Sequence, residues 1–596
     1  MKPFTLTPIA AAITLTLIAG CSPAQRDVVS KNVPTVPVQA ENRERTESRQ
    51  ELYEAKTAEE IERSDADLAA PAASSAQIVL QDAIGRSHAP RVKGSPVTPP
   101  ALGQPVLNYS EGLLDREKYA EFDTNPVKST AVDPLSTFGI DVDTASYSMA
   151  RTMLNQGLLP RPESVRAEEW INYFPSSYPV PDSEEQPFSV TTEIAPAPWD
   201  EDRLLLSIGL KGYEVPKGEI PPLNLTFLID VSGSMGSTGK LPLAISSLKM
   251  LTAQLRPQDR IAIVAYAGAA GLVLSSTPGN EKTKITNALD NLRAGGSTAG
   301  GAGIQLAYKV TREHHEPGNI SRVILMSDGD FNVGATDTDD LKKMVEHERK
   351  SGVQLSVMTF GRGNVRDELA QALAENGNGT AGYIDSAQEA KKLLVDGMAG
   401  TLMTIAKDTK AQVEFNPQLV SEYRLIGYET RHLEHHEFND DTKDSGDLGA
   451  GHTVTAMYEV ILHNSPDKLS PQLRYQSTPE VEATGVKANE VAYLKLRYKL
   501  PKSDTSTLIT RPIRVGDIKD TAETSDNFRW NAAVAAAGQY ARGVQWLKAW
   551  SYEQSRHLAN SAIGEDPYGH RAEFLRLMSL ASSLDGGPVA SASGQN

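Results

Sequence analysis

Three oxygen-bearing side chains follow one another on alternate residues near the middle of the chain. The apolar run 227–229 leads into Asp230, and Ser232 and Ser234 come directly after it. One carboxylate and two hydroxyls at this spacing can converge on a single hard cation, because such cations prefer oxygen ligands. Mg²⁺ also needs near-octahedral geometry and keeps some of its water in most protein sites. The segment therefore predicts part of a divalent-cation site.

Two more oxygen donors occur further along the chain. Thr298 lies in a glycine-flanked loop at 295–300, and Asp328 follows the apolar run 323–326. If such runs are neighbouring parallel strands, their carboxyl ends meet at one sheet edge, where open α/β sheets bind ligands. The alternative is that these side chains only cap turns and helices, but it requires five coincidences in register. The predicted metal ligands are therefore Asp230, Ser232, Ser234, Thr298 and Asp328.

The region around these donors alternates short apolar runs with helical patterns. Continuous apolar runs suit strands that are covered on both faces. The expected strands are 223–229, 261–265, 323–326 and 355–360. The expected helices are 241–255, 282–292, 301–314, 339–351, 365–375 and 387–405. This order predicts an α/β unit with a mainly parallel sheet and helices on both faces.

Further strands and helices are expected on either side of the α/β unit. Before it, the pattern predicts helices at 144–156 and 165–173 and strands at 188–194 and 204–210. After it, the expected strands are 412–415, 423–430, 453–462 and 491–500, and the expected helices are 527–550 and 570–580. Because strands occur on both sides of an intact α/β unit, we hypothesise that they pair into one β-sandwich.

The order of the five oxygen donors resembles the von Willebrand factor type A (VWA) domain and its metal-ion-dependent adhesion site (MIDAS). The resemblance covers about 222–406 and implies a Rossmann-like fold. It also implies that the hydroxyls bind the cation directly, while the carboxylates bind it directly or through water. In this fold an acidic residue of a protein partner completes the coordination. We expect Mg²⁺ as the cation, with Mn²⁺ or Ca²⁺ as alternatives.

The flanking regions resemble a family of bacterial VWA-domain lipoproteins. The segments that carry this resemblance are STFGIDVDTASYSMARTMLNQG, ESVRAEEWINYF and SDGDFNVG. The first two segments belong to the region 138–178, and the third lies at the end of the strand expected at 323–326. The region 526–580 matches the same family as well. The match extends over most of the part expected to fold, so it implies architecture more than a defined biological role.

The first residues of the chain predict export and a lipid anchor. A basic start and an apolar run at 9–19 have the length of a signal peptide and are short for a membrane span. Cys21 is the single cysteine and directly follows Leu-Ile-Ala-Gly, which resembles a lipoprotein lipobox. The resemblance implies cleavage before Cys21 and its lipidation; an ordinary signal peptide with a chance cysteine is the alternative. Ser22 implies, by the sorting rule of such lipoproteins, the outer membrane.

Composition then separates the chain into parts. Residues after the anchor are rich in Pro, Ala, Ser and Glu and poor in aromatic residues, which is typical of a disordered tether. The expected parts are a signal peptide (1–20), a disordered tether (21–125), an N-terminal flanking region of helices and strands (126–221), the VWA domain (222–406), a β-rich domain (407–510), a C-terminal helical region (511–584) and a disordered tail (585–596).

Other motifs fit catalysis or a second metal poorly. The segment 232–236 is close to a Gly-x-Ser-x-Gly nucleophile elbow, but its first residue is serine. Lys240 follows a glycine as in a P-loop, but leucine replaces the Ser/Thr that comes next. The histidine-rich run 432–436 lies in a loop-like stretch, where a solvated loop is the simpler interpretation. For Asp141 and Asp143 we expect packing and turn hydrogen bonds rather than a second ion.

Charge and the motifs together restrict the function. The formal net charge of −17 argues against nucleic acid as a partner, because phosphate binding needs a basic face. No positioned base or nucleophile is evident, so we expect no enzyme. We expect a membrane-anchored, cation-dependent protein-binding module for adhesion or envelope assembly, whose partner presents Asp or Glu. A metal-assisted envelope hydrolase and a purely structural scaffold are the alternatives.

Overall fold

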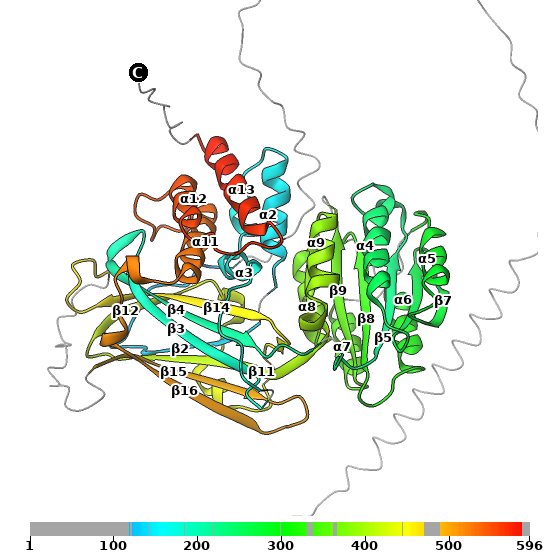
Figure 1. Cartoon of the computed structure of the whole chain (residues 1–596), viewed down its shortest axis with the longest axis horizontal. Helices are drawn as coiled ribbons and strands as arrows, with labels where there is room; N and C mark the ends of the chain where they lie inside the picture. The colour runs from blue at the N-terminus through cyan, green and yellow to red at the C-terminus, as the bar shows by residue number, and fades with distance from the viewer. Residues whose placement is uncertain are drawn as a thin grey trace, which may run out of the picture. The chain divides into compact units, whose positions relative to one another are not determined.

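The computed structural model describes most of the chain after the predicted tether (Figure 1). The described residues are 119, 122–141, 143–183, 185–216, 218–297, 300–329, 338–361, 366–443, 445–469 and 489–586. The predicted signal peptide, Cys21, nearly all of the tether and the tail after 586 lie outside the described residues. Thr298 also lies outside them. In the described part, no helix combines the length and apolarity that a membrane crossing requires.

A six-stranded sheet forms the centre of the VWA domain, with the order β10-β9-β8-β5-β6-β7. Its strands are β5 (Leu223–Asp230), β6 (Arg260–Tyr266), β7 (Ala270–Pro278), β8 (Ile320–Ser327), β9 (Val353–Phe360) and β10 (Ala381–Ile384). All neighbours are parallel except β7, which runs antiparallel to β6. All eight residues of β5 are buried, as expected of a central strand covered on both faces.

Helices cover both faces of this sheet. They are α4 (Leu241–Gln254), α5 (Lys282–Asp290), α6 (Gly300–Arg312), α7 (Thr338–Arg349), α8 (Asp367–Asn376) and α9 (Ala387–Lys391). Apolar residues of α4, α5 and α9 pack on one face, and those of α6, α7 and α8 pack on the other. The predicted doubly covered, mainly parallel sheet is therefore confirmed.

The two edge strands of the sheet and the end of the last helix differ from the expectation. The strands β7 and β10 were not expected, because β7 is largely exposed and β10 has only four residues. The helix expected at 387–405 is broken. After α9 the chain forms a π-helical turn, η4 (Lys392–Asp396), and the short helix α10 (Met398–Leu402), and it enters a strand at Thr404. Glycines at 397 and 400, which are poor helix formers, interrupt the helical pattern there.

Strands before and after the VWA domain pair with each other. The first sheet has the order β1 (Lys128–Ser129), β12 (Val420–Ile426), β14 (Thr453–Leu462), β4 (Asp200–Gly212), β3 (Phe188–Ala197). The second has the order β13 (Leu448–Gly449), β11 (Thr404–Phe415), β15 (Glu490–Lys499), β16 (Ser506–Arg514), and β2 (Leu135–Gly139) also pairs with β11. Residues 204–211 of β4 pair antiparallel with 453–460 of β14. Both sheets contribute to one apolar core, which confirms the β-sandwich hypothesis.

The VWA domain is an insertion between β4 and β11 of this sandwich, and both of its connections are held by neighbouring residues. The backbone N–H of Gly451 donates to the carbonyl oxygen of Tyr213, where the chain leaves the sandwich (2.8 Å). The N–H of Ala450 donates to the carbonyl oxygen of Met403, where the chain returns (2.8 Å). Entry and exit are therefore fixed at one place on the sandwich.

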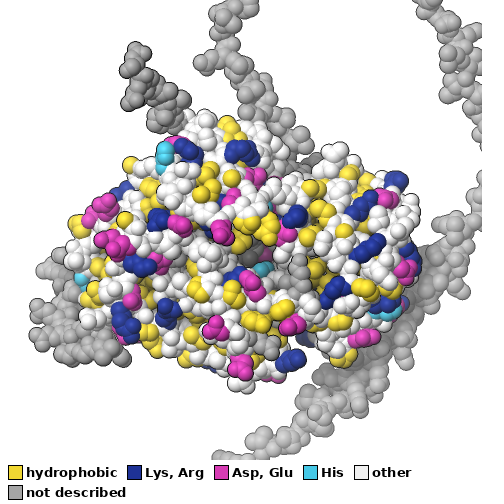
Figure 2. Space-filling model, viewed as in Figure 1, with side chains coloured by type: hydrophobic (Ala, Val, Ile, Leu, Met, Phe, Trp, Pro, Cys, Tyr) yellow, Lys and Arg dark blue, Asp and Glu magenta, His cyan; other side chains and the backbone are white. Residues whose placement is uncertain are grey.

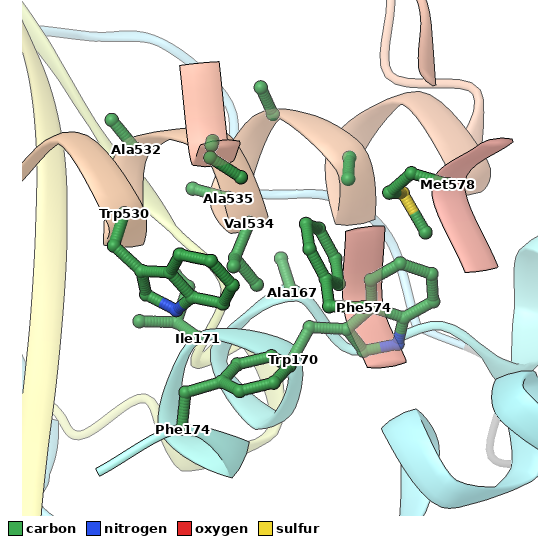
Figure 3. Packing of buried hydrophobic residues seen from close by; sticks show 14 of the residues in the cluster. Ala167, Trp170, Ile171, Phe174, Trp530, Ala532, Val534, Ala535, Phe574 and Met578 are labelled. Atoms are coloured by element: carbon green, nitrogen blue, oxygen red, sulfur yellow. The ribbon is translucent and has the colours of Figure 1, made fainter. Parts of the chain in front are cut away.

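A helical layer packs against the first sheet (Figure 1). It consists of α2 (Ala145–Asn155), α3 (Ala167–Tyr173), α11 (Asp526–Arg542), α12 (Tyr552–Asn560) and α13 (His570–Leu584). Figure 3 shows how Trp170 of α3, and Phe174 directly after this helix, meet Trp530 of α11 and Phe574 of α13. The helix expected at 527–550 ends at Arg542, because Gly543 adopts a left-handed φ of +76° and closes it. The helix α12 was not expected.

Buried ion pairs join the VWA domain to this helical layer. Nη2 of Arg151, on α2, lies 2.5 Å from Oδ1 of Asp385 and 2.7 Å from Oε2 of Glu389, both in the VWA domain. Nη2 of Arg166, which precedes α3, lies 2.7 Å from Oδ2 of Asp367 at the start of α8. Breaking such a pair would leave a charge buried without compensation, so these contacts fix the orientation of the inserted domain.

Candidate metal centre

The first candidate ligand ends the central strand. Asp230 is the last residue of β5 and is fully buried. Its Oδ1 accepts a hydrogen bond from the backbone N–H of Ser232 (2.8 Å), which bends the chain sharply at the carboxyl edge of the sheet. The 3₁₀ turn η3 (Gly233–Gly236) follows. The carboxylate is thus fixed by the turn that also carries the two serines.

The hydroxyls of Ser232 and Ser234 face each other across this turn. Their Oγ atoms lie 3.0 Å apart, and Ser232 is buried. Each hydroxyl oxygen has lone pairs that can point at a common third atom. Two hydroxyls and one carboxylate therefore converge within a few residues, as the sequence predicted.

The second carboxylate reaches the same place from the neighbouring strand. Asp328 directly follows β8, which pairs with β5 in parallel register. The hydroxyl of Ser327 donates to Oδ2 of Asp230 (3.1 Å), so the ends of the two strands are joined by a side-chain hydrogen bond. Burial, together with the charge of Asp328, raises the pKa of Asp230, although hydrogen bonds from Ser232 and Ser327 oppose the shift.

A lysine supplies positive charge to this cluster. Nζ of Lys240, the residue before α4, lies 2.7 Å from Oδ2 of Asp328, and their side chains are 10% and 0% exposed. Sequence reasoning considered Lys240 only as part of a P-loop and missed this pairing. The sequence feature that is connected with this pairing is the glycine at position 361, directly after β9. A Cβ at this position would lie 2.5 Å from Cγ of Lys240, so the lysine can reach Asp328 only past a residue without a side chain. The φ of +73° at Gly361 also favours glycine.

The loop that precedes the third hydroxyl is held against the first. The backbone N–H of Gly295 donates to the carbonyl oxygen of Val231 (2.7 Å), and the N–H of Gly233 donates to the carbonyl oxygen of Gly296 (3.1 Å). Thr298 comes two residues later but lies outside the described residues. The structure therefore brings together Asp230, Ser232, Ser234 and Asp328, and the role of Thr298 stays a prediction.

The donor set fits a hard divalent cation. Two buried carboxylates stand close together, and one of them is paired with the ammonium of Lys240. The remaining described donors are hydroxyl oxygens, which a Mg²⁺ ion accepts as ligands. Across the part of the chain that the structure describes, no group of three or more His, Cys, Asp or Glu could hold a metal. The candidate centre does not depend on such a group, since two of its four described donors are serines.

Family models match three consecutive parts of the chain. Residues 224–395 match the model of the von Willebrand factor type A domain, and 113–207 match a model described as von Willebrand factor. Residues 400–584 match the model described as uncharacterized protein YfbK, C-terminal. Among curated proteins, uncharacterized protein YfbK of Escherichia coli K12 is 45% identical over 473 residues, which cover 78% of this chain and 81% of the relative. The chain belongs to the YfbK family of VWA-domain proteins.

Other similarities are confined to smaller regions or to lower scores. Uncharacterized protein sll0103 of Synechocystis is 27% identical over 197 residues, which cover 33% of this chain and 45% of that protein. The solved structure of a von Willebrand factor type A protein from Catenulispora acidiphila is 17% identical, with a TM-score of 0.37. That alignment covers 68% of this chain and 91% of the other. The family assignment rests on the YfbK relative and the family models.

Two other groups that the sequence singled out serve the structure of this YfbK-family chain. The ring of His435 contacts Oγ1 of Thr137 through Nδ1 (3.1 Å) and Oδ1 of Asp133 through Nε2 (2.9 Å). Asp141 and Asp143 pair with the guanidinium of Arg431, at 3.4 and 3.3 Å. Asp143 also accepts a hydrogen bond from the backbone N–H of residue 381 (3.1 Å). The segment 432–436 is therefore held by side-chain contacts instead of being a solvated loop, and Asp141 and Asp143 form ion pairs instead of the expected turn hydrogen bonds.

Proposed function

We propose that this chain is a lipid-anchored protein-binding module of the cell envelope whose binding depends on one divalent cation. The observation that carries the proposal is the convergence of Asp230, Ser232, Ser234 and Asp328 at the carboxyl edge of the VWA sheet. Ligands of open α/β sheets bind at this edge. The family assignment adds a fold in which such a cluster is a known ligand set.

The residues of the candidate metal centre would bind the cation in two different ways. The hydroxyls of Ser232, Ser234 and Thr298 would be direct ligands, and the carboxylates of Asp230 and Asp328 would bind directly or through water. Mg²⁺ is the preferred ion, with Mn²⁺ or Ca²⁺ as alternatives. When bound, the cation supplies an attractive point for an acidic side chain of the partner. Because several ligands are neutral hydroxyls, the ion keeps much of its positive charge for that contact.

A binding role suits the surroundings of the centre better than hydrolysis. Among the described residues, Ser232 and Ser327 donate hydrogen bonds to Asp230 and Lys240 pairs with Asp328, so each of these groups is engaged in holding a carboxylate. A metal-assisted hydrolase would need a further base or nucleophile aimed at a bound substrate. Charges of both signs are interspersed over the face in Figure 2, which favours recognition at a defined site over recognition by a broad charged patch.

The anchoring part of the proposal rests on the sequence around Cys21. The residues before it form a lipobox-like end to an apolar run, and Ser22 after it favours the outer membrane. Acyl chains contribute about 0.8 kcal/mol per buried CH₂, so several chains on one residue anchor a protein firmly. The tether 21–125 would then let the folded part reach a partner away from the membrane.

A metal-dependent pull-down tests the binding function. The full-length protein is used as bait on envelope extracts in Mg²⁺ and after removal of divalent ions. We expect a protein that is captured only with Mg²⁺ and that is lost with the Asp230→Ala variant, whose fold is checked by circular dichroism. Capture that is the same in all arms would contradict cation-dependent binding. A hydrolase would instead reveal itself by turning over envelope components in the Mg²⁺ arm.

A further inference from the structure

A large cavity lies between the VWA domain and the β-sandwich, away from the candidate metal centre. Its volume is about 1150 Å³, and its walls come from the start of β8, the ends of α7 and α8, the segment before β10 and the loop before β13. Figure 2 shows the surface hollowed along the junction of the two parts. Cavities of this size at domain junctions are common places for small-molecule sites.

One wall of the cavity contains a buried guanidinium without a counter-charge. Arg322, the third residue of β8, is only 1% exposed. Its Nη1 donates to Oγ of Ser356 (2.7 Å) and its Nη2 to Oε1 of Gln354 (2.5 Å), and both partners are neutral. Its Nε has no hydrogen-bond partner, and among the described residues no carboxylate lies within 4.0 Å of the guanidinium.

This arrangement is costly unless something compensates the charge. Burial lowers the pKa of Arg322 to about 10, so the side chain is still a cation at neutral pH. Moving an uncompensated charge out of water costs several kcal/mol even after relaxation of the protein. Asp447, which also lines the cavity, acts on Arg322 through its charge, but the two side chains form no ion pair within 4.0 Å. The cavity is therefore where a compensating anion would have to lie.

The other acidic groups of the cavity are occupied elsewhere. Asp141, Asp143 and Glu375 all pair with the guanidinium of Arg431. A second guanidinium, that of Arg349, also lines the cavity, and its Nη1 donates to Oδ1 of Asn378 (2.7 Å); Asp447 is the acidic lining residue whose charge acts on Arg322. The corner around Arg322 is thus built to attract negative charge.

We propose that this cavity binds a small anionic ligand, which places a carboxylate or phosphate group on Arg322. The planar guanidinium suits such groups because it can donate two parallel hydrogen bonds to two oxygens of one anion. The rest of the cavity, which includes apolar side chains such as Val215 and Met358, would hold the body of the ligand. This site is independent of the divalent cation and of the partner proposed above.

Isothermal titration calorimetry of the full chain tests the site. The probes are inorganic phosphate, sulfate and succinate, titrated at constant ionic strength in buffer freed of divalent ions by a chelating resin. We expect saturable binding of at least one probe, and the identity of that probe separates phosphate-type from carboxylate ligands. Arg322→Lys keeps the positive charge but loses the two parallel donors of the guanidinium. Its affinity for the probe should therefore be weaker by about tenfold or more.

Arg260→Lys is the matched control, because Arg260 begins β6 of the same sheet, bonds to Ser276 and does not line the cavity. Its affinity should equal that of the wild type. If Arg322→Lys does not fold, hydrogen–deuterium exchange of the wild type is compared with and without the anion. An anion bound to Arg322 must slow the exchange of backbone amides in β8 and β9. Absence of saturable binding, unchanged affinity in Arg322→Lys, or unchanged exchange in those strands would overturn the proposal. Because the buffer contains no divalent ion, none of these outcomes bears on the metal centre.

Discussion

The ammonium group of Lys240 lies 2.7 Å from Oδ2 of Asp328, beside the hydroxyls and carboxylate that would hold a cation. A side-chain charge thus neutralises one candidate ligand inside the protein. Asp230, in contrast, accepts hydrogen bonds from Ser232 and Ser327 and forms no ion pair with any residue that the structure describes. The centre therefore combines one carboxylate that is already paired with one that a cation can still stabilise.

Divalent cations should stabilise the folded chain through the two serines. A ligand that binds only the folded state adds about 2.7 kcal/mol at a concentration 100-fold above its Kd. Thermal unfolding is measured with and without Mg²⁺ or Mn²⁺, and the double variant Ser232→Ala/Ser234→Ala should lose the shift. Ser246→Ala, on the exposed side of α4, is the control that keeps it. An equal shift in the double variant would argue against these ligands.

Replacing Lys240 by methionine should destabilise the metal-free protein. The Asp328 side chain is fully buried, and the loss of its ion pair with Lys240 would remove a compensating charge, at a cost of about 3–5 kcal/mol. Urea unfolding monitors the loss, and Mg²⁺ should restore part of it because the cation replaces the missing charge. Lys249→Met, whose ion pair with Asp290 is exposed, should change stability by less than about 1 kcal/mol. Equal effects of the two variants would refute this role of Lys240.

Glu168 should make stability fall as the pH rises from about 5 to 8. Burial, with the charges of Glu429 and Glu169, raises the pKa of Glu168 from 4.5 to about 8 in the folded chain. Between these values the folded state keeps a proton that the unfolded chain has released, so raising the pH favours unfolding by up to about 1.4 kcal/mol per pH unit. Glu168→Gln should flatten the pH profile of urea unfolding. The same profile in Glu168→Gln and in the exposed-site control Glu163→Gln would contradict the assignment.

The helical core should be sensitive to the loss of one aromatic ring. Phe574 is fully buried and contacts Trp530 and Phe174, with ring centroids 5.4 and 5.5 Å away. Phe574→Ala should reduce the free energy of unfolding by about 3–5 kcal/mol, through lost contacts and the cavity left behind. Leu584→Ala at the exposed end of the same helix should have an effect within about 0.5 kcal/mol. Comparable losses in both variants would mean that this core contributes little.

The sequence predicted the parts of the fold whose burial is periodic or continuous. The central strand β5 is buried at every residue, so its apolar run was plain in the sequence. The edge strand β7 was missed because its apolar run, 272–274, has only three residues and is flanked by a glycine and two serines. The helix α11 was predicted too long because its end depends on a single glycine, Gly543, and the separate helix α12, which begins after the Ser551 cap, was missed with it.

The candidate metal centre was predictable because its donors lie on short, local motifs. Asp230 and the serines share one turn, and Asp328 ends the adjacent strand. The partners Lys240 and Arg322 could not be assigned in the same way. A lysine before a helix and an arginine near the start of a strand are usually solvent-exposed, and only tertiary packing shows that both are buried.

The insertion of the VWA domain at one point of the sandwich makes the two parts separable in protein engineering. Tyr213 and Met403 are bonded to consecutive residues, Gly451 and Ala450, so a short glycine–serine linker can replace everything between them. Such a deletion would not reroute the strands on either side. In evolutionary terms, the sandwich could exchange the VWA domain for another inserted domain without a change in its own strand connections.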